Sequence, residues 1–251
     1  MQIRRSRQLL ACMGAAALLA MPLASWASFE QAEKAYVSNE HYAAFLAFVP
    51  LAKEGNAAAQ AMVAKSYYLG TGAPPDARAA ADWYQRAAAQ GHATAQYELA
   101  RLLAAGVGVT QDSKRAAEWM EKSAEQGVPW AMQAIGIMYR DGNGVAKDAV
   151  QAYKWLSLAA TQPETPATAE TIKLARDARA ELDKSMSADG VQQAGKLATT
   201  WSARKIARDT EWSKAINAPN APRTFAAKPA EPIDAKQPRA KNFSDGYFPK
   251  N

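Results

Sequence analysis

The chain has 251 residues, a formal net charge of +6 and an apolar fraction of 49%. It contains 59 alanines but only 7 isoleucines and 9 valines. Alanine is the best helix former, whereas strands favour β-branched residues. This composition argues against sandwiches, barrels and parallel α/β sheets. It predicts an all-α protein.

Residues 1–27 have the features of a secretory signal peptide. Three arginines precede the apolar run 9–23, and the small residues Ser25 and Ala27 flank Trp26. The alternative is a membrane anchor, but a run of 15 residues is shorter than the ~20 needed to span a bilayer. We therefore expect cleavage after Ala27, a periplasmic or secreted location, and no transmembrane segment in the mature chain.

Cleavage would change two properties of the chain. It removes Cys12, the only cysteine, so the mature chain would have no disulfide and no thiolate metal site. It also lowers the net charge from +6 to +3. Residues 28–214 carry 21 basic and 21 acidic residues, and the remaining excess lies in 215–251. That segment holds six of the 13 prolines and no apolar period, so we predict a disordered basic tail. No nucleic-acid partner is expected.

Three segments align without a gap at a period of 36 residues: 56–91, 92–127 and 128–163. Each segment holds a Gly-x-Gly pair, then an aspartate, then a tryptophan. The structural positions of the repeat are Gly70, Gly72, Asp76 and Trp83 in the first segment, Gly106, Gly108, Asp112 and Trp119 in the second, and Gly142, Gly144, Asp148 and Trp155 in the third.

Each segment predicts two helices. Apolar residues at helical spacing indicate first helices near 58–69, 94–105 and 130–141. The Gly-x-Gly pair ends each of them, and the aspartate is expected to cap a second helix near 76–90, 112–126 or 148–161. The tryptophans fall on the alanine-rich face of the second helices, so we expect all three to be core contacts between repeats.

Weaker patterns flank the three segments. Residues 28–55 resemble a partial repeat with a shortened first helix near 29–37. Residues 164–214 predict two further helices, which we interpret as a pair that caps the stack. One helix pair cannot bury its apolar face alone, so the repeats should stack into a right-handed α-solenoid.

The repeat resembles the Sel1-like repeat family, a branch of the tetratricopeptide-type helical repeats. The resemblance rests on Ala-x-Ala-Gln from Ala57, Gly-Thr-Gly from Gly70 and Asp-x-x-x-Ala-x-x-Trp from Asp76, with equivalents in the next two segments. It covers about residues 29–163. It implies a non-enzymatic adaptor that binds other proteins or peptides.

Residue patterns for catalysis or cofactors are weak. His41 and His92 have no metal-binding spacing, and His92 is expected to act in a turn or helix cap. Ser202-x-x-Lys205 matches one element of a β-lactamase-like hydrolase but has no partner motif. Helix-spaced glutamates at 118, 121 and 125 are expected to face solvent. We therefore predict no catalytic residue, no metal and no cofactor.

One face of the first helices is a candidate binding surface. In stacked helix pairs the first helices usually line the concave side, where tyrosine and arginine are common binding anchors. The candidate residues are Lys65, Tyr68, Tyr97, Arg101, Gln133 and Arg140.

These residues predict binding of an acidic protein or peptide segment. The leading interpretation is a scaffold of the bacterial cell envelope. The alternatives are a peptidoglycan-associated regulator of cell-wall enzymes and, less favoured, the hydrolase. The sequence does not predict an oligomeric state.

Overall fold

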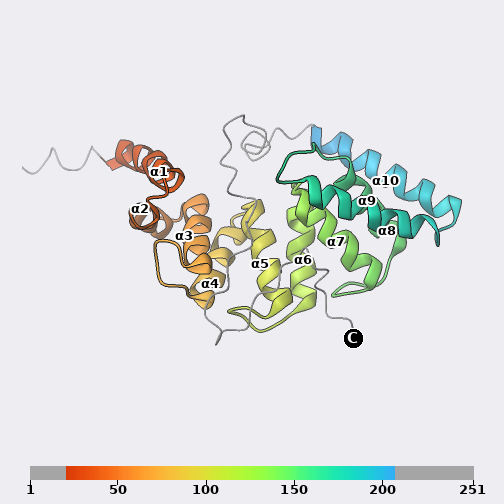
Figure 1. The fold of residues 1–251 in the computed structure, drawn as a ribbon, viewed down its shortest axis with the longest axis horizontal. Helices are drawn as coiled ribbons and strands as arrows, with labels where there is room; N and C mark the ends of the chain where they lie inside the picture. Colours follow the sequence, from red (N-terminus) through yellow and green to blue (C-terminus); the bar gives the residue numbers. More distant parts are fainter. Residues whose placement is uncertain (1–20, 207–251) are drawn as a thin grey trace, which may run out of the picture.

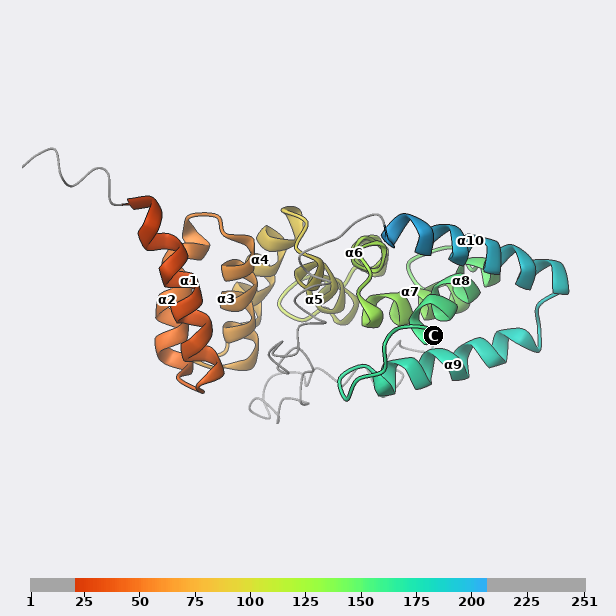
Figure 2. The same cartoon turned by 90° about the horizontal axis from the view of Figure 1, so that it is seen from above.

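The computed structural model describes residues 21–206, with side chains described for 29–202. Within these residues the chain forms ten α-helices and no strand. The predicted basic start of the leader, most of its apolar run and the tail 215–251 lie outside the described residues. The helices follow one another along an elongated array, from α1 and α2 at one end to α9 and α10 at the other (Figures 1 and 2).

The helices are α1 (Met21–Val37), α2 (His41–Lys53), α3 (Ala57–Leu69), α4 (Ala77–Ala89), α5 (Ala93–Ala105), α6 (Ser113–Glu125), α7 (Pro129–Asp141), α8 (Ala149–Ala160), α9 (Ala169–Asp183) and α10 (Ala188–Ile206). From α1 to α9, each helix packs against the next. The pairs α3–α4, α5–α6 and α7–α8 are the three predicted repeats, and their bounds differ from the predicted ones by at most one residue. The fold is an α-solenoid.

The predicted capping residues begin and end these helices. The carboxylate of Asp112 accepts a hydrogen bond from the backbone N–H of Arg115 at 3.0 Å, and Asp76 and Asp148 each accept two such bonds. Two of the first helices begin with a different capping residue. The side chains of Asn56 and His92 accept hydrogen bonds from backbone N–H groups of α3 and α5, respectively. This confirms the predicted cap role of His92. The first glycine of each Gly-x-Gly pair ends its helix in the left-handed conformation.

The second glycine of each pair has a role that the sequence did not predict. A Cβ on Gly108 would lie 2.1 Å from the carbonyl oxygen of Ala77, the first residue of α4 in the preceding repeat. In the same way, a Cβ on Gly72 would lie 2.2 Å from the carbonyl oxygen of His41, and one on Gly144 would lie 2.0 Å from that of Ser113. These loops therefore pack against the start of the preceding second helix so closely that only glycine fits.

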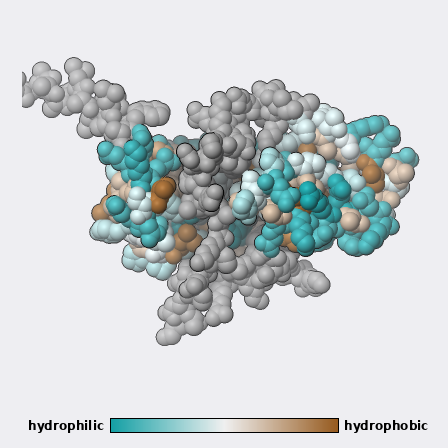
Figure 3. Space-filling view, turned by 45° about the horizontal axis from the view of Figure 1, so that its top comes forward, coloured by the Kyte–Doolittle hydropathy of each residue, from teal (hydrophilic) through white to brown (hydrophobic). Residues whose placement is uncertain are grey.

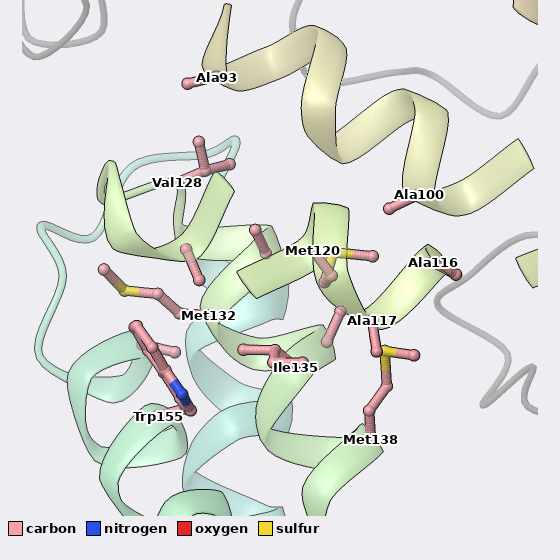
Figure 4. Packing of buried hydrophobic residues seen from close by; sticks show 14 of the residues in the cluster. Ala93, Ala100, Ala116, Ala117, Met120, Val128, Met132, Ile135, Met138 and Trp155 are labelled. Atoms are coloured by element: carbon pink, nitrogen blue, oxygen red, sulfur yellow. The ribbon is translucent and has the colours of Figure 1, made fainter. Parts of the chain in front are cut away.

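The core is built from small and flexible apolar side chains. Alanines on α5 and α6 let these helices approach each other, and methionines on α6 and α7 fill the remaining space (Figure 4). The close-up labels Ala93, Ala100, Ala116, Ala117, Met120, Val128, Met132, Ile135, Met138 and Trp155, all with at most 3% of their surface exposed.

Buried glutamines add polar contacts between repeats. The amide nitrogen of Gln96 donates to the carbonyl of Ala88 at 3.2 Å, and its amide oxygen accepts from Gln126 at 2.7 Å. The preceding repeat has the same arrangement through Gln60. Gln96 is only 5% exposed, so its amide has little access to water. These two hydrogen bonds satisfy the amide instead.

Helix α1 is longer than the sequence predicted. Its described part extends from Met21 rather than from near Phe29 and so runs through the predicted cleavage site after Ala27. The end of the predicted leader is therefore helical in the uncleaved chain.

The two last helices lie at the end of the stack, as predicted, but they do not pack as a pair. Helix α9 packs on α8 and α7. Helix α10 packs on another side of α8, and the two helices make little contact with each other (Figure 2). Residues 184–187 connect them.

The three repeat tryptophans are not equally buried. Trp155 is fully buried and meets Trp201 of α10 edge-on, with ring centroids 5.9 Å apart. Trp83 and Trp119 are only partly buried at the edge of the core, where Arg86 and Lys122 lie over their rings at 4.7 and 4.1 Å. All three tryptophans therefore contact the core, as predicted, but only Trp155, which α10 covers, is fully buried.

Candidate functional site

Three of the predicted binding residues come together on the face formed by the first helices. Tyr68 on α3 and Tyr97 and Arg101 on α5 interact electrostatically, and the Arg101 guanidinium lies 5.7 Å from the Tyr97 ring centre. Lys65 on α3 lies near them, with its amine 5.2 Å from the ring centre of Tyr36 on α1. We call Lys65, Tyr68, Tyr97, Glu98, Arg101 and Trp130 the first-helix cluster.

An ion pair holds the arginine of this cluster in place. Arg101 Nη1 lies 2.7 Å from Glu98 Oε2, and the two side chains are 19% and 20% exposed. Burial alone would lower the pKa of Arg101, but Glu98 and the neighbouring tyrosines more than offset this and raise it. The guanidinium therefore stays charged. Its charge is largely balanced by Glu98, so this part of the face is less positive than the sequence suggested.

Aromatic rings surround the ion pair. Burial raises the pKa of Tyr97 to about 12, and it also raises that of Tyr84, a fully buried residue of α4. Both phenols are neutral at physiological pH for this reason. The Tyr97 ring lies 6.3 Å from the ring of Trp130 on α7, so the aromatic surface continues onto the next repeat.

The other two predicted residues lie on α7. Gln133 is partly buried on α7, at the repeat position of Tyr97. Arg140, at the end of α7, binds the carboxylate of Asp141 at 2.7 and 2.9 Å and lies close enough to Glu181 of α9 to interact electrostatically. The three predicted cations therefore do not form one continuous basic groove.

Sequence reasoning missed part of this surface. Glu98 could have been found, because a glutamate three residues before an arginine on one helix is a typical ion-pair spacing. Tyr36, Tyr84 and Trp130 come from other helices, and their proximity depends on how the helices are packed. No local pattern reports this.

The residues considered above for catalysis or metal binding can be located in the structure. Among residues with described side chains, no group of three or more His, Cys, Asp or Glu residues could hold a metal ion. Glu121 and Glu125 make bonds between helices rather than only facing solvent: Glu121 accepts from Tyr139 at 3.0 Å and Glu125 from Trp201 at 2.8 Å. Ser202 lies in α10, and the side chain of Lys205 is outside the described ones.

None of the helices between residues 21 and 206 is both long and apolar enough to cross a membrane.

The fold and the recurring caps define a class: an α-solenoid of two-helix repeats. Within that class, residues 57–92, 93–128 and 131–163 each match the family model of the Sel1 repeat. The chain therefore contains three Sel1 repeats. Sel1 repeats in general form a non-catalytic scaffold that mediates protein–protein interaction.

Two solved structures are similar. One is c5321, a protective antigen present in uropathogenic Escherichia coli strains, which displays an SLR fold; it is 28% identical with a TM-score of 0.59. That match covers 70% of this chain but only 37% of c5321. The other is a Sel1 repeat protein from Oxalobacter formigenes, 26% identical with a TM-score of 0.53, covering 67% of this chain and 78% of that one. The sequence has no match among functionally curated proteins.

Proposed function

We propose that the chain is an exported adaptor of the bacterial cell envelope that binds a protein segment on the first-helix cluster. The observation that carries this proposal is the gathering of Tyr68 and Tyr97 around the charged Arg101, with Trp130 of the next repeat beside the Tyr97 ring. Tyrosine, tryptophan and arginine are the residues that most often dominate binding energy at protein interfaces. The export rests on the leader-like residues 1–27.

The cluster is held ready for binding before a partner arrives. Arg101 is fixed by Glu98, and Lys65 is held over Tyr36. A partner therefore pays little side-chain entropy to engage these groups. An apolar or aromatic anchor of the partner would lie on Tyr97 and Trp130, with an acidic residue directed to Lys65.

The binding face can be tested by photo-crosslinking in the bacterium that makes the chain. A photoreactive amino acid at Tyr68 should capture one discrete envelope protein, whereas the same group at Lys114, exposed on α6, should not. Recovery of the same proteins from both positions, or of none from Tyr68, would argue against this face.

Affinity for the captured protein gives a second test. Lys65→Glu should weaken binding about tenfold or more, because it reverses the charge that an acidic partner residue meets. Lys114→Glu makes the same change of net charge away from the cluster and should have no effect. Arg101 is unsuitable for this test because its loss would leave Glu98 buried without its ion pair.

Export has its own measurement. Fractionation should place the protein outside the cytoplasm, and N-terminal sequencing of the exported form should begin at Ser28. A product that begins at Met1 and stays in the cytoplasm would contradict export. The binding face is tested separately, by the crosslinking.

A further inference from the structure

Exposed apolar side chains gather at the N-terminal end of the array. Among residues 29–202, the large apolar side chains that stand exposed are Val37, Tyr42 and Leu46, at 64%, 68% and 52%. All three belong to α1 and α2. Apolar patches are visible on that end of the molecule, at the left of Figure 3. The outer stripe of α2 consists of Tyr42, Ala43, Leu46 and Pro50, which are spaced along one side of the helix and all exposed.

The repeat makes this stripe comparable with its equivalents in the other second helices. In α4 and α6 the matching positions are charged. In α8 two of them are apolar again. The positions of Tyr42, Leu46 and Pro50 are held by Arg78, Asp82 and Arg86 in α4, by Lys114, Glu118 and Lys122 in α6, and by Val150, Lys154 and Leu158 in α8.

The apolar stripe of α8 is covered by another helix. A Cβ on Gly190 of α10 would lie 4.0 Å from Val150, and Trp201 of α10 packs on Trp155. Leu158, the other apolar residue of this stripe, is only 3% exposed. In this array an apolar outer stripe therefore accompanies a covering segment, while the charged stripes of α4 and α6 face solvent.

The chain carries a segment that can reach α2. Helix α10 starts beside Val150 and reaches back to Glu125, the last residue of α6, so its end is directed toward the preceding repeats (Figure 1). From residue 207 the chain continues for 45 residues. At about 3.3 Å per extended residue it could span up to ~150 Å, more than enough to return to α2. It ends with three aromatic residues, Phe243, Tyr247 and Phe248, within six positions.

Charge also favours this pairing. Residues 28–55 carry four acidic and two basic residues, whereas residues 215–251 carry six basic and three acidic ones. Burial is the main cause that raises the pKa of Glu33 on α1, and the nearby Glu30 adds to it. A basic segment would offset the acidic excess of this end.

From these observations we propose that the aromatic C-terminal segment around residues 243–248 docks on the outer stripe of α2 of its own chain. The tail thereby covers the N-terminal end of the solenoid as α10 covers α8. Terminal repeats of such arrays need a polar or covered outer face to remain soluble, and this contact would supply it.

Disulfide trapping tests the contact directly, because the chain has one native cysteine that can be removed by Cys12→Ser. In that full chain, one variant combines Ala43→Cys with Ser244→Cys. The matched control combines Arg115→Cys, the equivalent exposed position two repeats later, with Ser244→Cys. Initial rates of intramolecular disulfide formation are read by non-reducing gel and mass spectrometry. Each rate is normalised to the reactivity of the corresponding single cysteine with glutathione disulfide.

Docking should make the Ala43 pair form about tenfold or more faster than the Arg115 pair, because it raises the effective concentration of the tail at α2. Proximity alone would favour the control, since α6 lies nearer to the end of α10. Adding Tyr42→Arg and Leu46→Asp gives α2 the residues of α4 and should remove the preference. Equal rates in the first two chains would overturn the proposal. Disulfide-linked dimers that increase with protein concentration would also overturn it, in favour of a second copy on this face.

Discussion

The close approach of Gly108 to α4 makes a strong prediction about stability. Gly108→Ala places a Cβ 2.1 Å from a backbone carbonyl oxygen of the preceding repeat. Because the obstacle is backbone, the loop must move away from α4. Gly91→Ala is the matched control: Gly91 also has a positive φ, but a Cβ there would meet nothing within 4 Å.

The magnitudes separate the two effects. A residue with a Cβ in the left-handed region costs about 1–2 kcal/mol, and this cost applies to both variants. Overpacking against fixed structure adds about 1–3 kcal/mol, and this applies only to Gly108→Ala. The φ values of +88° at Gly91 and +69° at Gly108 mean that backbone strain alone would, if anything, penalise the control more.

Thermal and urea unfolding of the purified chain measure this difference. Gly108→Ala should lose about 2 kcal/mol more than Gly91→Ala, which corresponds to about 4–8 °C in Tm for a domain of this size. Equal losses in the two variants would refute the idea that the loop is held against the neighbouring repeat. A loss confined to Gly91→Ala would refute it as well.

Three further predictions concern single side chains. Trp201→Phe keeps the ring contact but removes the N–H donated to Glu125 at 2.8 Å. Because Glu125 is half exposed, thermal unfolding should show a loss of only about 1 kcal/mol in stability. No loss at all would mean that the hydrogen bond is not formed in solution. Gln96→Leu should cost about 2 kcal/mol in urea unfolding, since two buried hydrogen bonds lose their partner, and a stabilised variant would contradict that reasoning. Burial lowers the pKa of His92, so the imidazole binds a proton more tightly in the unfolded chain than in the folded one. The free energy of unfolding should therefore fall as the pH drops from about 6.5 toward the folded-state pKa. His92→Asn, which copies the cap of Asn56, should flatten that fall, and an unchanged pH profile would show that another group causes it.

The sequence predicted most of the array because its signals are local and recur. Gly70, Asp76 and their equivalents mark helix ends through the backbone conformations and hydrogen bonds that they favour. A period of 36 residues repeats these signals three times, so the helix bounds follow to within one residue. The fold class needed no long-range information.

The site was predicted less well because its geometry depends on contacts between helices. Arg101 was correctly placed near Tyr97, but its pairing with Glu98 changes the charge that a partner meets. Arg140 pairs with its own neighbour Asp141, which a helical-face argument does not consider. The unequal burial of Trp155 and Trp83 arises from α10, which begins 33 residues after Trp155 and lies outside the repeat.

The contact between each second glycine and the preceding helix has a consequence for how such a chain can grow. The nearest atoms met by Gly72, Gly108 and Gly144 are backbone carbonyls, and the residues that own them are a histidine, an alanine and a serine. This contact therefore does not depend on the side chain of the residue that supplies the carbonyl. A duplicated or exchanged 36-residue unit would find the same backbone surface on either side, so the glycine contact itself needs no new mutation when the array lengthens. Surface residues, such as those of the first-helix cluster, are then free to diverge from one unit to the next.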